Sequence, residues 1–353
     1  MRILITGGCG FVGSSIALYF ANAYPKYTII VFDNLRRRGS ELNLKRLTEA
    51  GIQFVHGDIR NEYDLNGISA PDVIIEASAE PSVLAGIDSS PNYTIDTNLI
   101  GTIHALNFAR SCNAAFVFLS TSRVYPINQI EKVKVFESET RFEIDSAQQI
   151  AGVNKEGISE EFPLDGYRSI YGATKLASEI MIQEYHQFYG LNTIVNRCGV
   201  LTGPWQMGKV DQGFVVLWMA RHFWNRPLSY IGFGGQGKQV RDILHVLDLC
   251  RLVDQQLHHI NLFSGNIYNV GGGHQNSISL QEMTTLCRKI TGNHVAIDEV
   301  KENRPADIPI YITNNRKVQT TCGWKPEIQL PEIAQEVFSW ISQNKNELEP
   351  ILK

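Results

Sequence analysis

The first half of the chain alternates short apolar runs with segments of helical periodicity. The apolar runs predict strands at residues 2–6, 27–33, 52–56, 73–76, 115–120 and 192–195. The periodic segments between them predict helices near residues 11–22, 41–50, 95–112 and 171–189. Apolar strands that alternate with helices are typical of a parallel sheet covered by helices on both faces. We therefore predict a doubly wound α/β domain over residues 1–198.

Two later parts of the chain depart from this rhythm. Residues 126–168 are polar and rich in Glu and Ser, and a connection of this length is usually functional or mobile, so we interpret it as an insertion near the active site. After about Gly199, Gly and Pro punctuate the sequence, with predicted helices near residues 212–224, 279–291 and 330–344. We expect residues 199–353 to form mainly a smaller α/β lobe that binds substrate, with the option that segments of it return to the first domain.

A glycine-rich turn directly follows the first predicted strand. Gly7, Gly10 and Gly13 are spaced G-x-x-G-x-x-G and open a helix. Such glycines permit a tight turn and close approach of the backbone to a pyrophosphate, and the helix N-terminus attracts its negative charge. Asp33 ends the second strand twenty residues after Gly13, where a carboxylate can bind the ribose hydroxyls. This arrangement predicts a Rossmann domain that binds a dinucleotide.

The choice of dinucleotide depends on the charges that follow the second strand. Asp33 would repel a 2′-phosphate, which favours NAD over NADP. Arg36, Arg37 and Arg38 follow closely and could bind such a phosphate, although three arginines also suit a solvated turn. We predict NAD, with Asp58 and its neighbour after the third strand close to the adenine ring.

A tyrosine and a lysine one helical turn apart are the candidate catalytic pair. Of the 13 tyrosines, only Tyr171 has a lysine four residues later, Lys175, and this spacing places both on one helix face. An ammonium beside a phenol lowers the pKa of the phenol, which could then take a proton from a sugar hydroxyl as hydride leaves for a nicotinamide. Hydroxyls at residues 120–122, where the fifth strand ends, can bind the same substrate oxygen. The alternative is an accidental pair on a solvated face.

These motifs resemble the extended short-chain dehydrogenase/reductase family that modifies nucleotide sugars, over essentially the whole chain. Within that family, residues 32–35, 57–61, 211–213 and 237–242 most resemble enzymes that epimerise C2 of a CDP-linked hexose. The resemblance implies catalytic roles for Thr121, Tyr171 and Lys175. It implies cofactor binding by Gly7, Gly10, Phe11, Val12, Gly13, Asp33, Asn34, Arg36, Asp58, Ile59, Ala77, Ala79, Asn98, Ser120, Tyr171 and Lys175. The expected substrate contacts are Glu80, Ser122, Arg123, Asn196, Gln212, Arg241 and Arg304.

Two of these arginines are predicted from chemistry as well. A guanidinium binds phosphate oxygens in a bidentate manner, so Arg241 and Arg304 are candidates to clamp the diphosphate of a nucleotide sugar. Either side chain could instead be a surface ion-pair partner.

Two departures from related enzymes bear on the reaction. The 4,6-dehydratases of this family place Asp-Glu directly after the catalytic threonine, whereas Ser122 and Arg123 stand here. The 4-epimerases usually carry an asparagine just after the sixth strand, where this chain has Val200. We therefore expect NAD-dependent C2 epimerisation of a CDP-linked hexose. The alternatives are another 2- or 4-epimerase of a CDP- or UDP-hexose, or a non-catalytic NAD(P)-binding sensor or scaffold.

Composition excludes several other classes of function. With 32 basic and 36 acidic residues the chain has no basic field for nucleic acid. The six cysteines are scattered without a C-x-x-C pair, which argues against a metal site or a disulfide scaffold, and no apolar run reaches membrane-spanning length. We expect a cytoplasmic protein. The helices at 95–112 and 171–189 are apolar on more than one side, which favours a homodimer or homotetramer.

Overall fold

A seven-stranded sheet forms the core of the first half of the chain. Its order is β14-β10-β5-β4-β1-β2-β3, and the pairs from β10 through β3 run parallel. The computed structural model describes residues 1–208 and 212–353. The strands of this sheet are β1 (Arg2–Thr6), β2 (Thr28–Asp33), β3 (Gln53–His56), β4 (Val73–Glu76), β5 (Ala115–Thr121), β10 (Thr193–Cys198) and β14 (Asn266–Val270). The central strands are almost fully buried, as their apolar sequences require.

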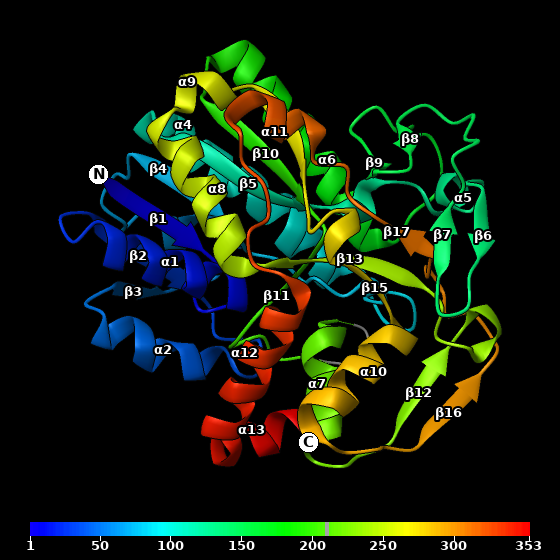
Figure 1. Ribbon diagram of the computed structural model, residues 1–353. Helices are drawn as coiled ribbons and strands as arrows, with labels where there is room; N and C mark the ends of the chain where they lie inside the picture. The colour runs from blue at the N-terminus through cyan, green and yellow to red at the C-terminus, as the bar shows by residue number, and fades with distance from the viewer. Residues whose placement is uncertain (209–211) are drawn as a thin grey trace. The chain divides into compact units, whose positions relative to one another are not determined.

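Helices cover both faces of this sheet. Figure 1 shows α1 (Phe11–Ala23), α2 (Ser40–Glu49) and α8 (Val246–His258) on one side, and α4 (Gly101–Cys112) and α6 (Ile170–Tyr189) on the other. The shorter helices of the same part of the molecule are η1 (Glu62–Leu65), α3 (Asn92–Ile95), η2 (Asp96–Ile100), η3 (Ser122–Val124) and α9 (Ile260–Phe263). The strand order reverses between β1 and β4, and ligands of doubly wound sheets bind at the carboxyl ends of the strands beside such a reversal. The predicted fold class is therefore confirmed.

The chain divides into two compact units that interleave in sequence. The first contains residues 1–124, 169–198 and 249–268, and the second contains residues 125–168, 199–248 and 269–353. The two units hold about equal lengths of chain. The polar segment 126–168 belongs to the second unit, and a later segment that includes most of α8 returns to the first.

The second unit is built around a four-stranded sheet in which β13 (Val240–His245) pairs with β11 (Val200–Thr202), β15 (Ser277–Ser279) and β17 (Ile310–Tyr311). Two-stranded sheets form from β12 (Leu228–Ile231) with β16 (Ile297–Val300), β6 (Val135–Glu137) with β7 (Phe142–Ile144), and β8 (Val153–Asn154) with β9 (Gly157–Ile158). The helices are α5 (Ile127–Ile130), α7 (Phe214–Phe223), η4 (Phe233–Gly235), η5 (His274–Asn276), α10 (Leu280–Thr291), α11 (Arg316–Cys322), α12 (Leu330–Gln343) and α13 (Lys345–Leu352).

Some element boundaries differ from those expected. The sixth predicted strand ends at residue 195, but β10 continues to Cys198 and so contains Asn196 and Arg197. The helix predicted from residue 212 begins only at Phe214, because Gly213 precedes it with a left-handed backbone (φ 74°). In the part of the chain that the structure describes, no helix is long and apolar enough to cross a membrane.

Candidate functional site

The glycine turn between β1 and α1 is packed too tightly for larger residues. A Cβ on Gly13 would lie 2.4 Å from the carbonyl oxygen of Gly7, and one on Gly7 would lie 2.7 Å from that of Ala77. Gly10 is the N-cap of α1 and offers no side chain to cap it, and the first turn, which contains Phe11 and Val12, holds no acidic residue. A glycine cradle that leads into an uncapped helix N-terminus fits the pyrophosphate of a dinucleotide.

Asp33 fixes the end of β2 against this turn. Its carboxylate accepts hydrogen bonds from the backbone amides of Cys9 (3.0 Å) and Leu35 (2.8 Å) and is almost excluded from water. Burial raises the pKa of Asp33, and these amides lower it. The residue predicted to bind ribose is thus also a structural tie between β2 and the glycine turn.

The residues predicted on the adenine side lie close together. Asn34 donates to the carboxylate of Asp58 at 3.0 Å, and Arg60 pairs with the same carboxylate at 2.6 Å. This guanidinium holds the pKa of Asp58 well below its usual range. Arg36 and Arg60 both lie over the ring of Tyr93, at 3.9 and 4.9 Å from its centroid. Arg36 therefore has an aromatic partner.

Two predicted residues on this side are buried against helices. Ile59 is buried, and its carbonyl oxygen lies 2.9 Å from a ring nitrogen of His104. Asn98 is fully buried in a π-helical turn; its amide oxygen accepts from the Glu80 amide at 2.7 Å, and its amide nitrogen donates to the Glu80 carbonyl at 3.1 Å. Asn98 thereby holds the loop after β4, which includes Ala77 and Ala79.

The first turn of α6 presents Tyr171 to the end of β5. Ser169 caps this helix by accepting a hydrogen bond from the amide of Gly172 at 3.2 Å. Burial raises the pKa of Tyr171 to about 12, while hydrogen bonding with the Thr121 hydroxyl and the positive charge of Arg123 act to lower it. The structure thus brings Thr121 and Tyr171 together as predicted. It differs from the expectation of a lowered phenol pKa, because burial outweighs the groups that favour the phenolate.

Lys175 lies one turn further along the same helix face. It is 1% exposed, and its Nζ lies 3.9 Å from the centroid of the Phe118 ring. Burial lowers the pKa of Lys175 to about 8, and Glu76, Cys198 and Glu179 act to raise it. Arg123, a residue predicted to bind substrate, is a cation that acts to lower the pKa of Tyr171.

Three buried charged residues beside this pair are absent from the predicted site. Glu179 continues the spacing of Tyr171 and Lys175 by one more turn, and it accepts hydrogen bonds from Arg197 and from Ser120. Glu76 is the last residue of β4 and is fully buried. The sequence contains signals for all three: a charge inside or at the end of an apolar strand, and the repeated four-residue helical spacing.

Asn196 takes part in a different contact from the one expected. It is fully buried in β10, and its side-chain amide exchanges two hydrogen bonds of 2.8 Å with that of Gln256. This geometry gives Asn196 a structural role in the sheet, and its predicted substrate contact stays a prediction.

In the second unit, the two predicted phosphate-binding arginines share one carboxylate. Arg241 contacts Asp307 at 2.9 Å and donates to the carbonyl of Ile308 at 2.7 Å, and Arg304 lies 3.4 Å from Asp307. The structure thus places the guanidinium groups of Arg241 and Arg304 around one carboxylate, that of Asp307. Gln212 directly precedes α7 and its N-cap glycine, whereas Asp211 of the same motif lies outside the described residues.

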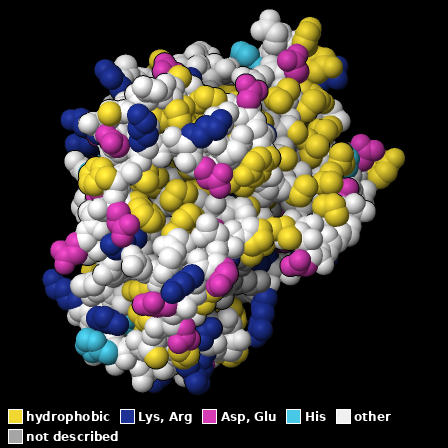
Figure 2. Space-filling view, turned by 90° about the vertical axis from the view of Figure 1, so that its right-hand side faces the viewer, with side chains coloured by type: hydrophobic (Ala, Val, Ile, Leu, Met, Phe, Trp, Pro, Cys, Tyr) yellow, Lys and Arg dark blue, Asp and Glu magenta, His cyan; other side chains and the backbone are white. Residues whose placement is uncertain are grey.

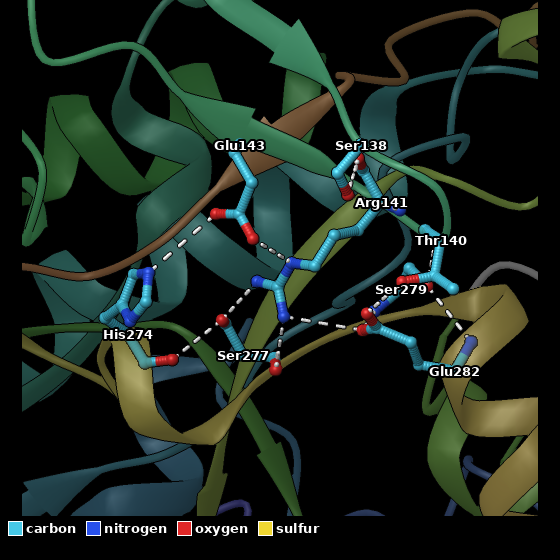
Figure 3. A network of polar contacts seen from close by, with 8 residues as sticks. All are labelled: Ser138, Thr140, Arg141, Glu143, His274, Ser277, Ser279 and Glu282. Atoms are coloured by element: carbon cyan, nitrogen blue, oxygen red, sulfur yellow. Dashed lines mark hydrogen bonds and ion pairs between the residues drawn. The ribbon is translucent and has the colours of Figure 1, made fainter.

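The hairpin β6–β7 of the 126–168 segment is anchored by Arg141. Its guanidinium pairs with Glu143 at 2.9 Å and Glu282 at 3.4 Å, and it also donates to Ser277 (Figure 3). Glu282 forms the capping box of α10 together with Ser279. Lys238 binds Glu137 at the other strand of the hairpin at 2.7 Å. These ion pairs fix the hairpin to the rest of the second unit.

Comparison with known proteins places this geometry in a family. A profile of the NAD dependent epimerase/dehydratase family matches residues 3–271. The CDP-paratose 2-epimerase of Salmonella typhi is 32% identical over 97% of this chain and 99% of its own length. A putative UDP-glucose 4-epimerase of Methanocaldococcus jannaschii is 28% identical over 97% of this chain and 99% of its own. Among solved structures, a dTDP-glucose 4,6-dehydratase from Streptomyces venezuelae, with NAD bound, superposes with a TM-score of 0.79 at 27% identity, covering 99% of this chain and 100% of its own.

These matches confirm the predicted resemblance, the enzymatic class and NAD as the cofactor. They extend over both units of the chain. They include epimerases and a dehydratase, so they do not by themselves select the reaction. On the family profile and a relative that is 32% identical over nearly the whole chain, this protein belongs to the NAD dependent epimerase/dehydratase family.

Proposed function

We propose that the protein inverts C2 of a CDP-linked hexose, converting CDP-paratose to CDP-tyvelose. The observation that carries this proposal is that Arg123 lies next to the candidate catalytic hydroxyls of Thr121 and Tyr171. Thr121 and Tyr171 are hydrogen-bonded, and Arg123 acts on Tyr171 from the position where related dehydratases carry an acid. The site thus offers groups for moving one hydroxyl proton and a cation beside them, but not the acid pair that elimination of water requires. The 32% identical relative is a CDP-paratose 2-epimerase, in line with this reading.

The proposed roles of the side chains follow from this arrangement. NAD, when bound, would supply the acceptor for the hydride of C2 and the donor for its return to the opposite face of the sugar carbon. Tyr171 takes the proton of the C2 hydroxyl as that hydride leaves and gives it back when the hydride returns. Thr121 donates a hydrogen bond to the same oxygen and favours the phenolate. Protons and electrons balance over the cycle, so no net oxidation occurs.

The cofactor and the substrate diphosphate each have proposed contacts. We assign the pyrophosphate of NAD to the glycine turn and its ribose to Asp33, and we assign Lys175 to the nicotinamide end. In the second unit, Arg241 and Arg304 carry two guanidinium groups around one carboxylate, Asp307. A substrate diphosphate placed there would exchange part of this ion pairing for bidentate phosphate contacts.

We also propose that the protein forms a homodimer or homotetramer through α6. Hydrophobic side chains gather over one half of the molecular face that is drawn in Figure 2. On α6, Ile180, Phe188 and Tyr189 are each at least half exposed. Helix residues of this kind are usually covered by protein, and a second copy of the same helix would cover them.

The test of the reaction compares three nucleotide sugars with the same preparation and no added cofactor. CDP-paratose, UDP-glucose and dTDP-glucose are each incubated with the protein, and the products are identified by NMR. We expect inversion at C2 of the CDP sugar only. Inversion at C4 of UDP-glucose would replace the proposal with a 4-epimerase, and a 4-keto-6-deoxy product from dTDP-glucose would replace it with a dehydratase.

A further inference from the structure

Glu76 is a buried carboxylate at the strand reversal that none of the steps above uses. It ends β4, and its register partners on the neighbouring strands are Thr6 of β1 and Phe118 of β5. One carboxylate oxygen accepts from the Thr6 hydroxyl at 2.7 Å, and the other accepts from the Ser78 amide at 3.0 Å. The side chain is fully excluded from water. The sheet therefore holds this carboxylate in one place, at the edge where ligands of such sheets bind.

The same sheet register places Glu76 beside the site of Lys175. Phe118 lies directly across from Glu76, so their side chains point to one face of the sheet. The Nζ of Lys175 lies over the Phe118 ring at 3.9 Å from its centroid. The ammonium thus lies over the strand position next to the carboxylate, and Glu76 is the strongest of the charged groups that raise the pKa of Lys175. The two groups act on each other through the low-dielectric interior.

Other titratable groups also face Lys175. Cys198 comes from β10, and Glu179 comes from α6 itself. Burial raises the pKa of the Cys198 thiol to about 12, so this group is neutral at working pH. Glu179 is bound by Arg197 at 2.7 Å, and this guanidinium offsets most of its charge. Burial raises the pKa of Glu76, while the Thr6 hydroxyl, the Lys175 charge and the Ser78 amide act to lower it. Among the groups that act on Lys175, Glu76 is the carboxyl without a guanidinium partner in the part of the chain that the structure describes.

We propose that Glu76 is a positioning residue that keeps Lys175 protonated in the active site. Without this carboxylate, burial would drive Lys175 toward the neutral amine, because a charge is costly in an apolar environment. The inference rests on the proposed function in one respect, which is that Lys175 belongs to the catalytic and cofactor-binding set. The residue that it holds responsible for the charge of Lys175 lies on β4, whereas Lys175 lies on α6.

The variant Glu76→Gln tests the charge alone. Glutamine has nearly the same shape but is neutral. Its amide oxygen can still accept from the Ser78 amide, while its NH2 group would donate to the Thr6 hydroxyl oxygen, which can accept as well as donate. The pKa of Lys175 should then fall from about 8 toward neutrality, and the alkaline limb of the pH–rate profile should move down by about one pH unit or more. The pH at which purified protein loses half of its NAD should move in the same direction. Thr6→Val is a graded variant, because it removes the hydrogen bond that most lowers the pKa of Glu76 and so favours the neutral carboxyl; it should shift both profiles in the same direction as Glu76→Gln but by less.

Two readouts separate this inference from the reaction. NAD retention requires no substrate, so a shifted retention profile in Glu76→Gln supports the role of Glu76 even if no nucleotide sugar is epimerised. Unshifted profiles in a folded Glu76→Gln protein would overturn it. If that variant does not fold, the carboxyl ¹³C resonance of Glu76 in the wild type decides, with Glu76→Asp to assign it. An ionised carboxylate at pH 7 supports the inference, and a neutral one overturns it.

Discussion

Arg197 of β10 donates from Nε and Nη2 to the carboxylate of Glu179 on α6, at 3.0 and 2.7 Å. Both side chains are at most 4% exposed. Ser120, which pairs with Arg197 across the sheet, donates to the same carboxylate. This contact fixes the rotation of α6 over β5 and β10. Because Tyr171 and Lys175 precede Glu179 on the same face of the helix, the ion pair also fixes where the candidate catalytic groups lie.

Arg197→Met should therefore destabilise the protein strongly. It leaves the carboxylate of Glu179 buried without its cation, which costs about 3–5 kcal/mol. Chemical denaturation measures the change in the free energy of unfolding. A matched control is Lys45→Met, which removes an exposed ion pair of α2 and should change the stability little. The double variant Arg197→Met with Glu179→Leu should recover much of the loss. An Arg197→Met protein as stable as the wild type would show that the pair does not hold α6.

Tyr171→Phe should retain NAD but lose turnover by at least about 10²-fold, the usual effect of removing a general acid–base group. The phenyl ring keeps the packing of a half-buried residue, so folding and cofactor content should be those of the wild type. Turnover is measured with the nucleotide sugar identified by NMR, and NAD by absorbance after release. Tyr189→Phe, at the other end of α6, is the control and should be fully active. Near-normal turnover of Tyr171→Phe would remove Tyr171 from the catalytic set.

The glycine turn, the acid at the end of β2 and the order of the first strands could be predicted because their causes are local. Gly7, Gly10 and Gly13 are required by a turn of a few residues, and the apolar runs reveal buried strands directly. The pairing of β14 with β10 could not be predicted in this way, because the two strands are far apart in the sequence. Periodicity shows that a strand is buried but not which strand lies beside it.

For the buried charged residues, too, the sequence does not show which residue of another element is the partner. Glu76 and Arg197 lie at or near strand ends in the sequence, where a charge normally indicates that the strand stops and water begins. Their partners, Thr6 and Glu179, come from other elements. The pKa of Tyr171 could not be predicted from the Lys175 spacing for a related reason: burial raises it to about 12, and burial is a property of the whole fold.

Cofactor choice is tested at Asp33. The wild type should copurify with NAD, and Asp33→Ala should retain it about ten- to a hundredfold more weakly, because charge-assisted hydrogen bonds to the ribose are lost. Alanine also removes the acceptor of the Cys9 and Leu35 amides and should lower the melting temperature. Asp33→Asn is the matched variant, since it keeps an acceptor oxygen but not the charge. NADP in the native protein would mean that a nearby arginine, such as Arg36, outweighs the carboxylate.

Ile180→Glu should convert the proposed assembly to monomers. The side chain is 52% exposed on α6, and a charge there cannot be buried against a second copy without a partner. Multi-angle light scattering at micromolar concentration gives the mass of each variant. Leu262→Glu is a matched control, because Leu262 is similarly exposed but lies on α9. A wild type that is already monomeric, or an Ile180→Glu variant that keeps its mass, would place the contact elsewhere or remove it.

The fate of the hydride at C2 separates the proposed mechanism from the two chemistries nearest to it. If Tyr171 moves only the hydroxyl proton and NAD carries the hydride, the hydrogen that leaves C2 returns to C2 and never exchanges with solvent. In deuterated water the product should therefore gain no carbon-bound deuterium, and substrate deuterated at C2 should give product that keeps its label. Both are measured by NMR and mass spectrometry on the same reaction. Deuterium at C2 would mean that carbon is deprotonated and reprotonated, which needs a base at carbon instead of hydride transfer. Deuterium at C6 with loss of water would mean elimination, and would require an acid that Ser122 and Arg123 cannot supply.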